Sequence, residues 1–279
     1  MKVGVIGAGT MGSGIAQAFA VMDGFEVVLC DITEELAARG KNRIAGSLSS
    51  LVSKGRMEQA GADAVLDRIT TGLRDKVFDC DLVVEAALEN MEVKKEIFTE
   101  LQKICKKDAI FASNTSSLSI TEMSRGLDRG VVGMHFFNPA PVMKLVEVIA
   151  GLLTPPETVE KVKEIAVRIG KTPIEVKDSA GFVVNRILVP MINEAVGIYA
   201  EGVASAEDID AAMMLGANHK MGPLALGDLV GLDVCLAIME VLYAESGDTK
   251  YWPHPLLRKM VRGGMLGKKS GRGFYDYSR

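Results

Sequence analysis

Short apolar runs alternate with helix-like segments over the first 177 residues of the chain. The runs are rich in β-branched residues and are bounded by Gly, Pro and polar residues, a pattern that predicts strands. We expect strands over Lys2–Ile6, Glu26–Cys30, Ile69–Leu73, Leu82–Glu85, Ile110–Ser113, Val131–Phe137, Lys144–Ile149 and Pro173–Val176. Strands that alternate with helices in this way predict an α/β domain with a mostly parallel sheet.

Two helical patterns separate the second and third expected strands. They cover Glu34–Leu51 and Met57–Arg68, and Lys54-Gly55 interrupts the periodicity between them. One helix is enough to connect two parallel strands. The extra helix therefore predicts an inserted helical hairpin, which without further information could be a plain structural insertion.

Strand signals end near residue 180, and only helical patterns follow. The expected helices are Gly181–Gly202, Ala206–Leu215, Ala225–Ala244 and Pro255–Val261. Ser205 is a good N-cap for the second of these helices, and Gly222-Pro223 should break the pattern before the third. We therefore predict two domains, an α/β domain over residues 1–180 and an all-α domain over residues 181–279.

The first predicted strand leads into a glycine-rich turn with the spacing Gly7-x-Gly9-x-x-Gly12. Gly7 allows the tight turn, Gly9 lets the backbone approach a pyrophosphate, and Gly12 lets the helix and strand pack closely. The next strand ends in Asp31, about 20 residues further on, where a carboxylate bonds the ribose 2′-hydroxyl and repels a 2′-phosphate. This order of elements predicts a Rossmann-type site for NAD. The alternative is a glycine-rich turn with a surface Asp.

Composition narrows the possible functions. The chain is 48% hydrophobic and 24% charged, which is typical of a globular protein. A net charge of −4 and a pI near 5.6 argue against nucleic acid as a partner. We expect no membrane span, because the most apolar stretch, Leu224–Ala244, carries three acidic residues.

The N-terminus superficially resembles a secretory signal, with Lys2 before an apolar stretch and Ala18-Phe19-Ala20 as an A-x-A site. Glycines between Gly7 and Gly14 would break the apolar segment, so we reject this interpretation. The four cysteines lack the spacing of a zinc site or a disulfide framework. Buried free thiols in a reducing compartment are the simpler interpretation, and we expect a cytoplasmic protein.

Two polar residues interrupt apolar strands in the second half of the α/β region. His135 lies in an apolar run just before Asn138-Pro139, and Glu147 lies among strand formers on the following run. A short turn between the two strands would bring the side chains together. A carboxylate beside a His fixes its tautomer and stabilises the imidazolium, so the pair suits general acid–base catalysis. Taken singly, each could be an ordinary structural residue.

Other polar residues are less informative. Ser116 lies in a hydroxyl-rich turn after a strand, where it could cap a helix or donate to a substrate oxygen. Asn185, in the first expected helix of the second domain, could be an ordinary surface residue. We interpret His219 and His254 as structural.

These motifs together resemble the short-chain L-3-hydroxyacyl-CoA dehydrogenases, most closely the bacterial 3-hydroxybutyryl-CoA dehydrogenase group, along the whole chain. The resemblance rests on the segments GAGTMG (7–12), SNTSSL (113–118), HFFNP (135–139), MKLVEV (143–148), GFVVNR (181–186) and GKKSGRGFY (267–275). The first segment is common to many NAD enzymes, whereas the others together are specific.

The resemblance implies a role for each matching position. The implied catalytic set is His135, Glu147, Ser116 and Asn185. The implied cofactor-binding residues are Gly7, Gly9, Thr10, Met11, Gly12, Asp31, Glu89, Lys94, Asn138 and Lys269. The hairpin would contact coenzyme A through Ser47 and Lys54, and Ser116 would also touch the substrate. Many relatives have a further Lys where this chain has Ser53, so we expect weaker phosphate attraction there without an effect on the activity.

The resemblance further implies oxidation of (3S)-3-hydroxyacyl-CoA, with 3-hydroxybutanoyl-CoA and acetoacetyl-CoA as the expected pair, by hydride transfer to NAD. It also implies a homodimer, or a multiple of one, built on the second domain. Two other functions stay open. One is a non-catalytic dinucleotide-binding protein, and the other is a β-hydroxyacid dehydrogenase that acts on a free acid.

Overall fold

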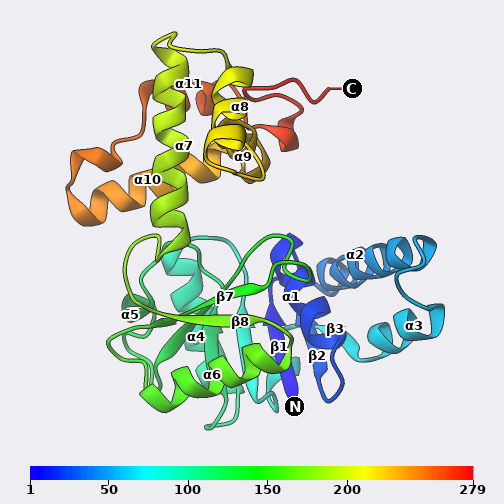
Figure 1. The fold of residues 1–279 in the computed structure, drawn as a ribbon. Helices are drawn as coiled ribbons and strands as arrows, with labels where there is room; N and C mark the ends of the chain where they lie inside the picture. Colours follow the sequence, from blue (N-terminus) through cyan, green and yellow to red (C-terminus); the bar gives the residue numbers. More distant parts are fainter. Residues whose placement is uncertain (279) are drawn as a thin grey trace. The chain divides into compact units, whose positions relative to one another are not determined.

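A computed structural model describes residues 1–278 and divides the chain into two compact units. The first unit is Met1–Asp178, and the second begins at Ser179. The first contains every named strand and the second is helical (Figure 1). Within residues 1–278, no helix is both long and apolar enough to cross a membrane.

The first unit is built on an eight-stranded sheet in the order β3-β2-β1-β4-β5-β6-β7-β8. The strands are β1 (Lys2–Ile6), β2 (Glu26–Cys30), β3 (Ile69–Gly72), β4 (Leu82–Glu85), β5 (Ile110–Ser113), β6 (Val131–Phe136), β7 (Leu145–Ala150) and β8 (Thr172–Lys177). All neighbouring strands are parallel except β6 and β7, which form an antiparallel pair. The predicted α/β class is confirmed, and each expected strand is present with ends shifted by at most one residue.

Different helices cover the two faces of this sheet. The helices of this unit are α1 (Thr10–Ala20), α2 (Glu34–Ser53), α3 (Gln59–Asp67), α4 (Met91–Ile104), α5 (Ile120–Met123) and α6 (Pro156–Arg168). The helices α1, α2 and α6 share one apolar core, in which Phe19 contacts Phe136 of β6. On the other face, Phe98 of α4 packs against Phe111 of β5 with ring centroids 5.7 Å apart.

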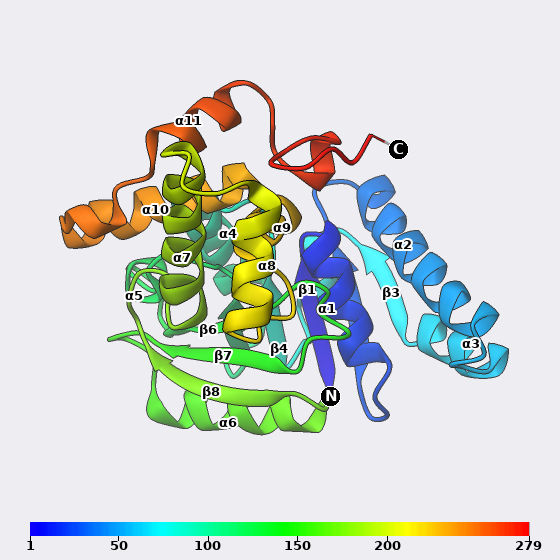
Figure 2. The ribbon, with the colours of Figure 1, turned by 45° about the horizontal axis from the view of Figure 1, so that its top comes forward.

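The predicted helical hairpin is present. Its helices α2 and α3 lie beside the edge strand β3 (Figure 2). Thr33 begins α2 as its N-cap, because its hydroxyl accepts a hydrogen bond from the N–H of Leu36. The buried residues Ile44 and Leu48 of α2 join the core of the sheet, so the hairpin is anchored to the α/β unit.

The second unit consists mainly of α7 (Val184–Ala200), α8 (Ala206–Gly216), α9 (Pro223–Val230), α10 (Leu232–Ser246) and α11 (Pro255–Arg262). They surround an apolar core that includes Ile192, Leu224 and Leu257. Ser205 caps α8 as predicted, with its hydroxyl accepting from the N–H of Asp208. Gly222 is the N-cap of α9, so the break expected at Gly222-Pro223 is also confirmed.

Two predicted boundaries in this unit are wrong for backbone reasons. The single helix expected over 225–244 is two helices, because Gly231 has φ +104° and separates α9 from α10. The helix expected from Gly181 begins only at Val184. Gly181 and Phe182 have φ values of +67° and +50°, which are incompatible with a right-handed helix.

Candidate functional site

The glycine-rich turn after β1 has the close contacts that its spacing predicts. Gly7 has φ +96°, and a Cβ on it would lie 2.6 Å from the backbone oxygen of Ala86. A Cβ on Gly12 would lie 1.7 Å from the carbonyl oxygen of Gly7. A Cβ on Gly9 would meet no atom within 4 Å. Two glycines are therefore required by packing, whereas Gly9 borders open space that a ligand can approach.

Helix α1 begins at this turn without a side-chain cap. Gly9 is the N-cap, and the first turn holds no acidic residue, so its backbone N–H groups and the positive end of the helix dipole remain available to an anion. Beside the turn, Asp31 accepts hydrogen bonds from the N–H of Ala8 at 2.7 Å and of Ile32 at 2.7 Å. These features fit a dinucleotide, with its pyrophosphate at α1 and its adenosine ribose at Asp31.

His135 and Glu147 form a buried pair. The antiparallel register of β6 and β7 sets the two residues directly opposite each other. The distance from Nδ1 of His135 to Oε2 of Glu147 is 2.8 Å, and the residues are 5% and 1% exposed. Strand pairing thus brings together two polar side chains that the sequence places 12 residues apart.

The end of β6 and the segment that leads to β7 are each held by one side chain from another part of the unit. Asn114 accepts the N–H of Phe136 at 2.8 Å. Lys171 donates from Nζ to the carbonyl oxygens of Ala140 at 2.6 Å and Met143 at 2.8 Å. Burial lowers the pKa of Lys171, and the positive charge of Lys144 lowers it further. Lys171 therefore holds this segment from inside the protein.

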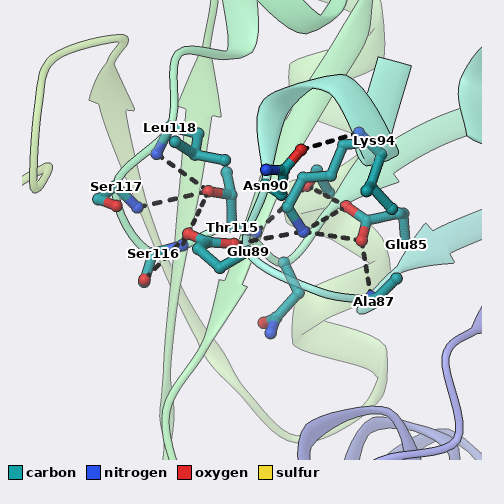
Figure 3. Close-up of polar contacts among 12 residues, drawn as sticks. Glu85, Ala87, Glu89, Asn90, Lys94, Thr115, Ser116, Ser117 and Leu118 are labelled. Carbon is teal, nitrogen blue, oxygen red and sulfur yellow. Dashed lines mark hydrogen bonds and ion pairs between the residues drawn. The ribbon is translucent and has the colours of Figure 1, made fainter. Parts of the chain in front are cut away.

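A second polar cluster lies at the ends of β4 and β5 (Figure 3). Glu85 ends β4 and is fully buried, and its carboxylate accepts from Nζ of Lys94 at 2.7 and 2.8 Å. Ser113, at the end of β5, donates to the same carboxylate at 2.6 Å. Lys94 is only 1% exposed and also pairs with Glu89 at 3.3 Å. The Lys94 ammonium is thus held between two carboxylates.

Glu89 joins this cluster to the hydroxyl-rich turn after β5. Its carboxylate accepts from the Thr115 hydroxyl at 2.7 Å, and from the Ser116 N–H and hydroxyl at 2.8 and 3.1 Å. Burial raises the pKa of Glu89, but the Lys94 charge and these hydrogen bonds outweigh it and lower the pKa overall. Ser119, not Ser116, caps α5, so the helix-capping interpretation of Ser116 is wrong.

The remaining predicted site residues lie on the helical hairpin, in the β6–β7 segment or in the second unit. Ser47 lies on α2 and Lys54 is its C-cap, and both are exposed. Asn138 is exposed at the start of the β6–β7 segment. Asn185 lies in the first turn of α7, and Lys269 pairs with Asp233, with its Nζ 2.7 Å from Oδ2.

Sequence reasoning assigned no role to several members of these clusters, among them Glu85 and Lys171. Glu85 could have been predicted from the sequence, because it is an acidic residue directly after the apolar run Leu82–Val84. Glu147 was predicted from a similar pattern, an acidic residue within an apolar strand. An ionised carboxylate is rarely buried without a partner. Lys171 gave no such signal, because its carbonyl partners are backbone atoms about 30 residues away.

Comparison with known proteins gives matches along the whole chain. Residues 2–179 match the family "3-hydroxyacyl-CoA dehydrogenase, NAD binding domain", and residues 181–277 match "3-hydroxyacyl-CoA dehydrogenase, C-terminal domain". A 3-hydroxybutyryl-CoA dehydrogenase of Clostridioides difficile is 56% identical, with 100% of both chains covered. The human mitochondrial hydroxyacyl-coenzyme A dehydrogenase is 44% identical, covering 99% of this chain and 90% of the human one.

A solved structure gives the same result. The crystal structure of (S)-3-hydroxybutyryl-CoA dehydrogenase from Ralstonia eutropha superposes with a TM-score of 0.95 at 49% identity. The match covers 100% of this chain and 99% of that one.

Proposed function

The chain belongs to the 3-hydroxyacyl-CoA dehydrogenase family, and from that premise we propose that it interconverts (3S)-3-hydroxyacyl-CoA and 3-oxoacyl-CoA with NAD. The proposed substrate pair is 3-hydroxybutanoyl-CoA and acetoacetyl-CoA, after the names of its relatives. The observation that carries the proposal is the buried His135–Glu147 pair in a unit of the NAD-binding family. Such a pair can exchange a proton with a substrate hydroxyl.

The residues of the glycine-rich turn are the proposed cofactor ligands. Gly7 and Gly12 shape the turn, and the N–H groups of Gly9, Thr10 and Met11 would face the pyrophosphate. Asp31 would accept from the adenosine ribose. The further proposed contacts are Asn138, Glu89, Lys94 and Lys269. NAD, when bound, supplies the hydride acceptor at its nicotinamide ring.

His135 is the proposed acid–base. Its Nδ1 faces Glu147, so Nε2 is the nitrogen that would take the proton from the C3 hydroxyl of the substrate. The Glu147 carboxylate keeps the Nδ1–H tautomer and would stabilise the imidazolium that forms. In the reduction of 3-oxoacyl-CoA, His135 would return that proton to the C3 oxygen.

Two further residues are proposed to hydrogen-bond the C3 oxygen, Ser116 and Asn185. The position of Ser116 is supported by its contacts with Glu89, which fix both its backbone and its hydroxyl. Lys94 is buried, so it would act mainly by holding Glu89 in place.

Coenzyme A is proposed to bind along the helical hairpin. Ser47 and Lys54 are exposed on α2 and at its end. A Lys ammonium at this position can attract a phosphate group of coenzyme A. The alternative is a plain structural insertion, since Ala62 and Val65 of the second helix are buried in the core.

We also propose a homodimer, or a multiple of one, assembled through the second unit. That unit of about 100 residues can bury only part of its own apolar surface, and Ile187, Val203 and Leu215 are among its exposed apolar residues. A cytoplasmic location is proposed as well. Its support is that all four cysteines are free and buried, as expected in a reducing compartment.

The decisive experiment measures NADH absorbance with acetoacetyl-CoA as substrate, beside acetoacetate as a free-acid control. We expect NADH oxidation with the thioester and little with the free acid. Oxidation with the free acid alone would favour a β-hydroxyacid dehydrogenase. NADH binding without oxidation of either would make the chain a dinucleotide-binding protein. A panel of C4 to C16 acyl-CoAs would then establish the chain-length preference.

A further inference from the structure

Helix α2 packs directly against the glycine-rich turn. Gly40 allows this approach, because a Cβ on it would lie 2.6 Å from the Cβ of Ala8 and 2.9 Å from its carbonyl oxygen. One turn further along α2, Nη1 of Arg43 donates to the Ala8 carbonyl at 2.9 Å and to the Ser13 hydroxyl at 3.2 Å. Ser13 itself donates to the same carbonyl at 2.9 Å. The Arg43 guanidinium is therefore fixed on the turn at one nitrogen.

Ala8 is hydrogen-bonded both to this guanidinium and to Asp31, the proposed ribose-binding acid. The N–H of Ala8 donates to Oδ2 of Asp31, and its carbonyl accepts from Arg43. The two charges thus lie at the two ends of one residue, within the ~8–10 Å Debye length of ordinary buffers. A 2′-phosphate on a ribose bound at Asp31 would therefore experience both charges.

We propose that Arg43 is a specificity-determining residue that lets this site accept the 2′-phosphate of NADP, so that Asp31 makes NAD preferred without excluding NADP. The proposal rests on the cofactor site described under the proposed function. An Arg close to the ribose is a general means of accommodating a 2′-phosphate on this type of fold.

The donors that such a contact needs are available on Arg43. A guanidinium carries five N–H groups, and Nη1 uses its hydrogens on the turn. Within residues 1–278, no protein acceptor is assigned to Nε or Nη2 of Arg43, and the residue is exposed at its surface. Arg binds phosphate through two parallel hydrogen bonds more readily than Lys does. A fixed guanidinium with unused donors is suited to this task.

Arg39 offers a matched control on the same helix. It lies one turn before Arg43, is exposed, and pairs with Glu35 on the helix surface. Replacing either Arg by Gln removes one positive charge from α2. Gln at position 43 can still donate to a carbonyl, so Arg43→Gln tests the charge more than the packing, and Arg43→Lys restores the charge.

The first test is calorimetry with the full chain and two halves of the cofactor, adenosine 2′,5′-bisphosphate and 5′-AMP. Arg43→Gln should weaken binding of the bisphosphate about 5–20-fold relative to 5′-AMP, as expected when a charged hydrogen-bond donor to the phosphate is replaced by a neutral one. Arg43→Lys should restore most of the wild-type ratio of the two affinities. Arg39→Gln should leave that ratio within about twofold of the wild-type value. Equal weakening of both nucleotides by Arg43→Gln would overturn the proposal and leave Arg43 as a support of the turn.

The second test uses kinetics in a background that favours NADPH. Asp31→Ser should raise the ratio of kcat/KM for NADPH to that for NADH, because it removes the repelling charge. Adding Arg43→Gln should then lower that ratio again by about 5–20-fold. An unchanged ratio would overturn the proposal. If both nucleotides bind but acetoacetyl-CoA is not reduced, the proposed function fails, whereas Arg43 is still judged by the calorimetric ratio.

Discussion

Replacement of Glu147 by Gln tests the central pair of the proposed mechanism. The substitution keeps the shape of a side chain that is 1% exposed and leaves one oxygen able to accept from Nδ1 of His135, 2.8 Å away in the wild type. What it removes is the negative charge that faces the imidazolium. We therefore expect a loss in kcat, with NADH binding retained.

The magnitude follows from the type of hydrogen bond. A hydrogen bond to a charged group contributes about 1.5–3 kcal/mol, and one between neutral groups about 0.5–1.5 kcal/mol. The difference of about 1–2 kcal/mol corresponds to a rate loss of roughly 5–30-fold. His135→Gln removes the proton acceptor itself and should lower kcat by about 10²–10⁴-fold. We therefore expect the smaller loss of kcat for Glu147→Gln and the larger one for His135→Gln.

The assay is NADH oxidation with saturating acetoacetyl-CoA, measured for the wild type, both single variants and the double variant. If Glu147 acts through His135, Glu147→Gln should have little further effect once His135 is Gln. Independent, multiplying losses would refute the pairing as the basis of catalysis. Near-normal turnover of folded His135→Gln would remove His135 from the mechanism.

Three further predictions concern the parts around this pair. Lys54→Ala should raise KM for acetoacetyl-CoA but not for NADH, and the effect should shrink at high salt; equal KM values for Lys54→Ala and for an exposed control, Lys107→Ala, would make Lys54 an ordinary surface residue. Lys171→Met should lower the free energy of unfolding by about 1–3 kcal/mol in urea, because two carbonyl groups lose their donor; a loss no larger than that of Lys144→Met would contradict this role. Light scattering at micromolar concentration should show a dimer or a multiple of one, and a fully active monomer would contradict the proposed assembly.

Some of this protein could be predicted from the sequence because the interactions responsible are local. The glycines of the turn and the strand before it lie within 12 residues, and their spacing follows from backbone geometry. The contact between His135 and Glu147 was also within reach, because a short segment joins two strands that pair directly. Their catalytic roles, like those of Ser116 and Asn185, remain predictions.

The two breaks in the second unit were less accessible. Gly231 interrupts an apolar pattern that continues on both sides of it, so hydrophobic periodicity alone does not separate α9 from α10. The backbone conformation of Gly231 separates the two helices, because φ +104° is incompatible with a continuous right-handed helix. Gly181 and Phe182 delay the start of α7 for the same reason.

The polar clusters were decided by tertiary structure alone. Glu85 meets Ser113 only because β4 and β5 are neighbours in the sheet, and Arg43 meets Ala8 only because α2 packs on the turn after β1. Residues 28 and 35 positions apart have no local constraint on their distance. Most of the elements and the chemistry they carry were predictable from the sequence, since both depend on near neighbours. Which charges share a buried site was determined by how those elements pack, because burial makes unpaired charges too costly to keep.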